Sequence, residues 1–197
     1  MSVFGVKSMV LNLLQEWNRM LKDKEVGHKI QPIGAVRKWS RPAEGWIKIN
    51  TDAACKRGCD HIGIGCIVRN DMGSFVRARS SAVRGIFHPR EAEAISLKEV
   101  LPWNKEWTNS KCIYETNSKF SVDAIYGTRG KSYFDTIMDD CVELFKHFEQ
   151  VLVVFVPRSV NIVAHILAHV AYYESNLKEL FINALEFIDC NLILEDY

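Results

Sequence analysis

The chain contains 197 residues, of which 48% are hydrophobic, 25% charged and 11% aromatic. This composition is typical of a globular protein. It excludes a disordered chain, which has fewer aromatic residues, and a collagen-like chain, which has more Gly and Pro. The longest apolar run, at residues 151–156, is too short to cross a membrane. Polar residues interrupt the N-terminal segment, so we expect no signal peptide, an intracellular protein (nuclear or cytoplasmic) and reduced cysteines.

The formal charge is +1 in total but unevenly distributed along the chain. Residues 1–90 carry 16 Lys and Arg against 7 Asp and Glu, a net charge of +9. Residues 91–197 carry 9 against 17, a net charge of −8. Such a chain can fold with one positive face that meets phosphate, or its two halves can pack together and cancel. Charge alone leaves both interpretations open.

The first half of the chain predicts one helix followed by strands. Apolar residues at helical spacing predict an amphipathic helix at 7–24, and scattered Pro and Gly predict a basic linker at 25–45. Alternating apolar and polar residues then predict a strand at 46–52. Two further strands, at 62–68 and 74–83, are joined by turn residues and predict a hairpin.

The second half alternates helices with short strands. The predicted helices are 91–107, 118–127, 135–148 and 161–173, and the predicted strands are 112–115 and a buried strand at 151–156. Three antiparallel strands followed by two parallel strands define an α/β fold, with a mixed five-stranded sheet flanked by helices.

The prediction divides the chain into three parts. An N-terminal helix and basic linker occupy 1–44, a central domain 45–175, and an acidic tail 176–197, which we expect to be helical over 177–194. Both terminal helices are rich in apolar residues. They are therefore expected to pack on the domain or on each other, or to bind a protein partner or a second copy of the chain.

Two acidic residues are the first candidates for a functional site. Asp52 lies in the first strand beside small and apolar residues, where a carboxylate is unfavourable unless it is paired, hydrogen-bonded or bound to a metal. Glu93 lies in the first long helix, two residues after Glu91, so at most one of these glutamates faces a site. The alternatives are an Asp52 exposed at an edge or turn and a Glu93 on a solvated helix face.

Five segments, in order, resemble the plant ribonuclease H-like domains of the reverse-transcriptase-like, retroelement-derived family. Gly45–Ala54 is similar to the family's opening strand, Gly-Trp-x-Lys-x-Asn-x-Asp-Gly-Ala, and 158–168 is similar to its Arg-x-x-Asn-x-x-Ala-Asp-x-Leu-Ala. The other three segments are 62–73, 91–93 and 115–118. The resemblance covers about 45–171. It implies a ribonuclease H-like fold, a site where four carboxylates hold two divalent metal ions, and RNA–DNA hybrids as substrate.

The four site residues that the resemblance implies are Asp52, Glu93, Asn117 and His165, and two of them depart from the family. Asp52 and Glu93 match its first two carboxylates and are the expected metal ligands, whereas Asn117 and His165 stand where the family has Asp. One lost charge pair at about 4 Å is worth on the order of 4 kcal/mol before solvation. We therefore expect Mg²⁺ or Mn²⁺ to bind weakly or not at all. The pair His165 and His169 could hold a softer metal or be ordinary helix residues.

Nucleic-acid binding can survive a loss of cleavage, because its affinity comes mostly from phosphate contacts by Lys and Arg. The candidates for such contacts are Lys48, Arg77 and Arg79. Asn117 and Ser118 could reach a phosphate or a 2′-hydroxyl group. The alternative is that these charges only keep the protein soluble.

The sequence therefore predicts a nucleic-acid-binding ribonuclease H-like protein that is weak or inactive as a nuclease. Its expected partner is an RNA–DNA hybrid or another nucleic acid, and not a membrane. Two alternatives stay open. One is an active hybrid endoribonuclease that uses Asn117 and His165 as neutral ligands, with Mn²⁺ preferred. The other is a protein-interaction module that binds no nucleic acid.

Overall fold

The structure is a computed structural model that describes residues 39–56, 58–173 and 179–183. The predicted N-terminal helix at 7–24 lies outside these residues, and so does most of the predicted tail. None of the described helices is long and apolar enough to cross a membrane.

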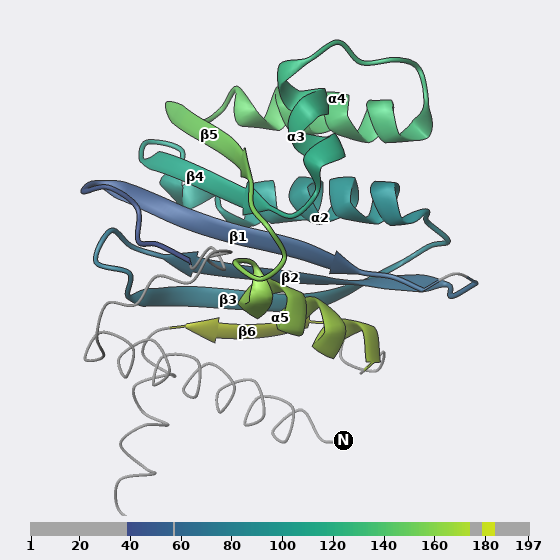
Figure 1. The fold of residues 1–197 in the computed structure, drawn as a ribbon, viewed down its shortest axis with the longest axis horizontal. Helices are drawn as coiled ribbons and strands as arrows, with labels where there is room; N and C mark the ends of the chain where they lie inside the picture. Colours follow the sequence, from purple (N-terminus) through teal and green to yellow (C-terminus); the bar gives the residue numbers. More distant parts are fainter. Residues whose placement is uncertain (1–38, 57, 174–178, 184–197) are drawn as a thin grey trace, which may run out of the picture.

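The described chain forms one mixed sheet with the strand order β5-β4-β1-β2-β3-β6 (Figure 1). Strands β1, β2, β3 and β6 are antiparallel neighbours, whereas β4 and β5 run parallel to β1. The first five strands confirm the predicted α/β class and its mixed five-stranded sheet. Their bounds, with that of the sixth, are β1 Trp46–Ala54, β2 His61–Arg69, β3 Phe75–Arg84, β4 Lys111–Thr116, β5 Gln150–Phe155 and β6 Glu179–Asn183.

The predicted tail helix is wrong at its start, where Glu179–Asn183 forms strand β6. This strand pairs with β3, from Arg77 opposite Asn183 to Ser81 opposite Glu179. Without β6, the edge of β3 would leave a row of backbone N–H and C=O groups unpaired. A short apolar segment can satisfy those groups as a strand, and periodicity alone does not separate such a segment from a helix.

Strand β5 corrects a second prediction, because the sequence predicts a buried strand here. It forms the other edge of the sheet, and Leu152, Val154 and Phe155 are 45%, 41% and 43% exposed. Only Val153 of this strand is buried. A continuous apolar run is typical of a strand covered on both faces, but it does not tell where in the sheet the strand lies.

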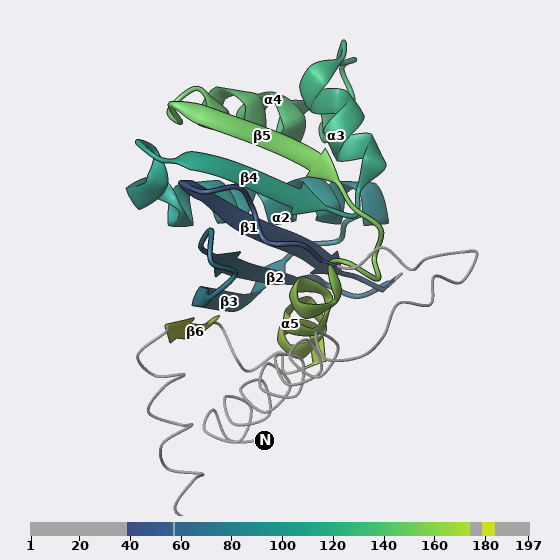
Figure 2. The ribbon, with the colours of Figure 1, turned by 60° about the vertical axis from the view of Figure 1, so that its left-hand side comes forward.

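The helices cover the two faces of the sheet unequally. Helices α2 (Pro89–Trp103), α3 (Lys119–Tyr126) and α4 (Tyr133–Phe145) lie on one face, and α5 (Ile162–Tyr173) lies on the other (Figures 1 and 2). The first predicted long helix ends earlier than expected, and Lys105–Trp107 forms a separate 3₁₀ turn. Pro89 lies at the start of α2, a position where its fixed φ angle and missing N–H cost nothing.

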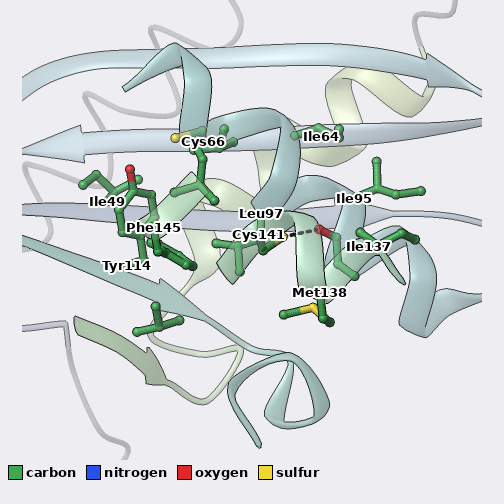
Figure 3. Packing of buried hydrophobic residues seen from close by; sticks show 14 of the residues in the cluster. Ile49, Ile64, Cys66, Ile95, Leu97, Tyr114, Ile137, Met138, Cys141 and Phe145 are labelled. Carbon is green, nitrogen blue, oxygen red and sulfur yellow. Dashed lines mark hydrogen bonds between the residues drawn. The ribbon is translucent and has the colours of Figure 1, made fainter. Parts of the chain in front are cut away.

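The main core lies between the sheet and helices α2 and α4 (Figure 3). Ile49 and Tyr114 point from the sheet toward Leu97, Met138 and Phe145 of the helices. The rings of Tyr114 and Phe145 meet edge to face, with centroids 5.4 Å apart. Each such fully buried side chain contributes about 1.5–3 kcal/mol to folding. This rigid layer fixes α2 against β1.

Helix α5 packs directly on strand β2 because glycines leave room for its backbone. A Cβ atom at Gly63 would overlap the carbonyl oxygen of Ala168, and one at Gly65 would overlap that of Ala164. This close approach places His165, the next residue of α5, over the neighbouring strand β1. Small residues in β2 thus position the last of the predicted site residues.

Candidate active site

The four residues Asp52, Glu93, Asn117 and His165 come from four different segments and meet where the inner strands β1 and β4 end. Strands β1 and β4 are parallel, and the pairing of Thr51 with Thr116 brings the next residues, Asp52 and Asn117, side by side. Asp52, Glu93 and Asn117 line a cavity of about 730 Å³. His165 reaches the same place from α5 through a hydrogen bond to Asp52.

Asp52 is almost fully buried, and both of its carboxylate oxygens accept hydrogen bonds. Oδ1 accepts from the N–H of Ala53 at 2.9 Å, and Oδ2 lies 2.8 Å from Nδ1 of His165. Because a carboxylate only accepts, Nδ1 of His165 carries the proton and donates it to this bond. The site therefore satisfies its first carboxylate with the chain's own donors.

Arg158 lies against the same imidazole. Its Nη2 lies 2.7 Å from Nε2 of His165 and 3.1 Å from Nδ1. A guanidinium only donates, so Nε2 of His165 is the acceptor in this contact. The hydrogen bonds from Arg158 to His165 and from His165 to Asp52 place a permanent positive charge near the buried carboxylate.

Glu93 is the second acidic group of the site, and its Oε2 is buried without a hydrogen-bond partner among the described residues. Burial raises the pKa of Glu93 well above its usual value of 4.5, and the charge of Asp52 and a hydrogen bond to it raise it further. The fold thus favours the neutral form of this carboxyl group.

The raised pKa of Glu93 predicts a dependence of stability on pH. Below pH 4.5, Glu93 is protonated in the folded and the unfolded chain and does not lower the free energy of unfolding. Above pH 4.5, the unfolded chain loses this proton first, so the free energy of unfolding falls as the pH rises toward the pKa of the folded state. We expect Glu93→Gln to raise the free energy of unfolding at pH 7, and the gain to vanish toward pH 4. Urea unfolding across this range measures it.

The control for this prediction is Glu99→Gln on the same helix. Glu99 does not line the cavity, so the same change there is expected to leave the pH profile as it is in the unmodified protein. A Glu93→Gln chain that is less stable at pH 7, or equally affected at every pH, would contradict the prediction.

Asn161 forms hydrogen bonds to strand β1 and to Asn117, which follows strand β4. Its Nδ2 donates to the carbonyl of Thr51 at 2.8 Å and to Oδ1 of Asn117 at 3.3 Å. Its Oδ1 accepts from Nδ2 of Asn50 at 3.1 Å. Asn161 therefore fixes the orientation of Asn117, a role that the sequence prediction did not assign although Asn161 lies inside a matched motif.

Lys48 is not at the surface, although the sequence predicts a phosphate contact there. Its side chain is buried, with Nζ 2.8 Å from Oε1 of Glu115 and 2.6 Å from the carbonyl oxygen of Ser40. The ring of Trp39 lies against the ammonium, 5.2 Å from its centroid. The ammonium group of Lys48 is thus paired with groups of the protein itself.

Arg77 and Arg79 are likewise engaged within the fold, at a distance along the sheet from the cavity. The Arg77 guanidinium stacks on Trp103 and Trp107, 4.0 and 4.2 Å from the ring centroids. It also donates to the carbonyl oxygen of Trp103 at 2.6 Å. Arg79 donates to the carbonyl oxygen of Glu99 at 3.1 Å. Neither residue lines the cavity.

These contacts predict that Arg77 contributes to stability. We expect Arg77→Ala to lower the free energy of unfolding by about 2 kcal/mol, because it removes a cation–π stack and charged hydrogen bonds. Urea unfolding measures the change, and the exposed Arg84→Ala on the same strand is the control. An Arg77→Ala chain with unchanged stability and weakened hybrid binding would show instead that Arg77 contacts phosphate.

Ser118 lies at the cavity and caps helix α3. Its Oγ accepts from the N–H of Ser121 at 3.3 Å, and its side chain, like that of Asn117, lines the cavity. The cavity is also lined by Lys119, Phe120 and Arg158, which the sequence did not single out for binding, and by Arg90, one of the basic residues in the first half of the chain. Arg158 lies within a matched motif, and Lys119 and Phe120 directly follow the matched segment 115–118. Among the described residues, no group of three or more His, Cys, Asp or Glu is arranged to hold a metal ion.

The sheet order, the helices on both faces and an acidic pair on β1 and α2 define a ribonuclease H-like domain. Residues 50–171 match the family described as reverse transcriptase-like, and the chain belongs to this family. Among curated proteins, none matches the chain.

Solved structures agree on the fold. The RNase H1 of the archaeon Halobacterium salinarum is 18% identical with a TM-score of 0.60, over 66% of this chain and 99% of that one. The N-terminal RNase H domain of a Mycobacterium tuberculosis protein is 20% identical, with a TM-score of 0.59, over 68% and 97%. LC11-RNase H1, from compost, was solved in complex with an RNA/DNA hybrid. It is 16% identical, with a TM-score of 0.55, over 66% and 99%.

Proposed function

We propose that this chain is a nucleic-acid-binding member of its family whose two-metal site is degenerate, so that it binds RNA–DNA hybrids but cuts them poorly or not at all. One observation carries the proposal: the hydrogen bond from Nδ1 of His165 to Oδ2 of Asp52. The imidazole of His165 occupies the position of the family's fourth carboxylate, and it donates a hydrogen bond to the first carboxylate, Asp52. The matched motifs also support an origin in plant retroelements.

The residues present do not fit a pair of divalent metal ions. Mg²⁺ prefers charged oxygen ligands in an octahedral arrangement. Here, both oxygens of Asp52 already accept hydrogen bonds. Asn117 is uncharged, and the His165 nitrogen nearest the acids carries a proton. We therefore assign no metal-dependent step to this chain.

Two observations support the binding half of the proposal. LC11-RNase H1, which shares the fold, was solved with an RNA/DNA hybrid. In this chain, three basic side chains line the cavity beside the acidic pair: Arg90, Lys119 and Arg158. Phosphate contacts supply most of the affinity for nucleic acid, so these side chains would retain binding after cleavage is lost.

The test combines cleavage and binding of one labelled RNA–DNA hybrid. Purified protein is incubated with the hybrid in Mg²⁺ and then in Mn²⁺, with Asp52→Ala in parallel, and the same samples are run in a gel-shift assay. We expect a salt-dependent shift and little or no cleavage. Cleavage that Asp52→Ala abolishes would establish the alternative of an active nuclease with a variant site. No shift at low salt would favour a protein-interaction module.

A further inference from the structure

The cavity beside Asp52 has a positive rim. Arg90 comes from the start of α2, Lys119 from the start of α3, and Arg158 from the loop between β5 and α5. All three side chains are exposed to solvent. The nearest acidic partner of Lys119 is Asp123, at 4.0 Å on the same exposed helix surface, where a pair is worth little.

The acidic groups of the same cavity lie at its floor. Asp52 is 1% exposed, and both of its oxygens already accept hydrogen bonds. Oε2 of Glu93 is buried as well. Arg158 reaches over this floor to the imidazole of His165. A ligand that enters the cavity therefore meets the cations first, and the negative charge below them is partly neutralised by Arg158.

Two helices begin at this cavity. Pro89 and Arg90 open α2, and Ser118 caps α3 ahead of Lys119 and Phe120. Pro89 has no N–H and the N–H of Ser121 already donates to Ser118, so the first-turn amides without an acceptor in their own helix include those of Arg90, Lys119 and Phe120, and they carry partial positive charge. Together with the three basic side chains, they favour an anion with several oxygen acceptors, such as a phosphate group.

An exposed aromatic ring stands next to these cations. Phe120 is 58% exposed and lines the cavity, and the Arg90 guanidinium lies over its ring at 4.0 Å. Exposed aromatic rings beside phosphate-binding cations are platforms on which unpaired bases stack. The ring therefore favours a phosphate that belongs to a nucleic-acid strand over free phosphate.

We propose that this cavity, which holds metal ions in the family, here binds a backbone phosphate directly through Arg158, Lys119 and Arg90, and that Phe120 stacks on an adjacent base where that base is unpaired. This inference deepens the proposed function, on which it rests for its choice of ligand. On this proposal the cavity binds an anion in place of a metal cation. Arg158 supplies the positive charge that a metal ion would otherwise bring.

The experiment measures affinities of the full chain by calorimetry in the presence of EDTA. The probes are inorganic phosphate, a 5′-phosphorylated thymidine dinucleotide and an RNA–DNA hybrid. We expect Arg158→Gln and Lys119→Gln each to weaken hybrid binding about tenfold and to lower the salt slope by about 1. Lys131→Gln, an exposed lysine outside the cavity, is the matched control and is expected to bind as the unmodified protein does. Phe120→Ala is expected to weaken the dinucleotide about tenfold but not inorganic phosphate.

The outcomes separate this inference from the proposed function. If the hybrid binds but Arg158→Gln and Lys119→Gln bind it normally, or if EDTA abolishes binding, the phosphate site is overturned and the proposed function stands. If phosphate and the dinucleotide bind and the hybrid does not, the phosphate site is supported and the proposed binding of hybrid is wrong. If Phe120→Ala leaves the dinucleotide affinity unchanged, base stacking is overturned.

Discussion

The double substitution Asn117→Asp with His165→Asp is expected to give the chain Mg²⁺-dependent cleavage of RNA–DNA hybrids. It returns two carboxylates to the positions where the family has them, next to Asp52 and Glu93. Each restored charge pair at about 4 Å is worth on the order of 4 kcal/mol before solvation, or up to about a thousandfold in metal affinity. Calorimetry with Mg²⁺ and a hybrid-cleavage assay measure the two effects separately.

Arg158 sharpens this prediction. Once His165 is replaced by a carboxylate, the guanidinium that now faces the imidazole would pair with that carboxylate and compete with a metal ion. We therefore expect the cleavage rate at saturating hybrid to rise further when Arg158→Gln is added to the double variant, although the affinity for hybrid falls. Asn117→Asp with Tyr173→Asp is the matched control, since it adds the same charge to the same helix at an exposed position outside the cavity.

Cleavage by the double variant must also depend on Asp52, so a further Asp52→Ala change is expected to abolish it. A double variant that binds Mg²⁺ and the hybrid but stays inert would show that the lost carboxylates are not what limits cleavage. The degenerate-site proposal would then be wrong.

The regular elements of the central domain could be predicted because they depend on local patterns. The alternation in 46–52 and the periodicity in 161–173 each reflect which side chains face the core, and both segments form the expected elements. The edges of the sheet could not be predicted in this way. The pairing of 179–183 with β3 depends on two segments about a hundred residues apart, and the exposure of β5 depends on what lies beside it.

The site shows the same division between local and long-range information. Motif order was sufficient to select Asp52, Glu93, Asn117 and His165. The hydrogen bond from His165 to Asp52 depends on the close approach of α5 to β2 and on Arg158, which no local pattern encodes. The state of that site is therefore visible only in the folded chain.

Charged residues were the least predictable part. The sequence treats Lys48 and Arg77 as solvated cations, because most such residues are exposed. In the fold, Lys48 meets Glu115, and Arg77 lies on Trp103. Both partners come from distant segments, so the burial of these cations is a property of the sheet and helix packing and not of their own neighbours in sequence.

The buried pair of Lys48 and Glu115 leads to the second large expected effect, on stability. Both side chains are nearly inaccessible, at 6% and 8%, with Nζ and Oε1 2.8 Å apart. Removing one partner of such a pair leaves an uncompensated buried charge. We expect Lys48→Met to lower the free energy of unfolding by about 3–5 kcal/mol. Urea unfolding measures this, and the exposed Lys111→Met on the neighbouring strand is the control.

We expect the loss of both partners together to lower the free energy of unfolding far less than the loss of one partner alone. Replacing both partners, as Lys48→Met with Glu115→Leu, removes the buried charge altogether, and such replacements are often neutral or stabilising. The double variant is therefore expected to recover most of the stability lost by Lys48→Met, and a double-mutant cycle gives the coupling. It is also expected to bind hybrid normally, since Lys48 does not line the cavity. A stable Lys48→Met chain that loses hybrid affinity would reverse this assignment and make Lys48 a phosphate contact.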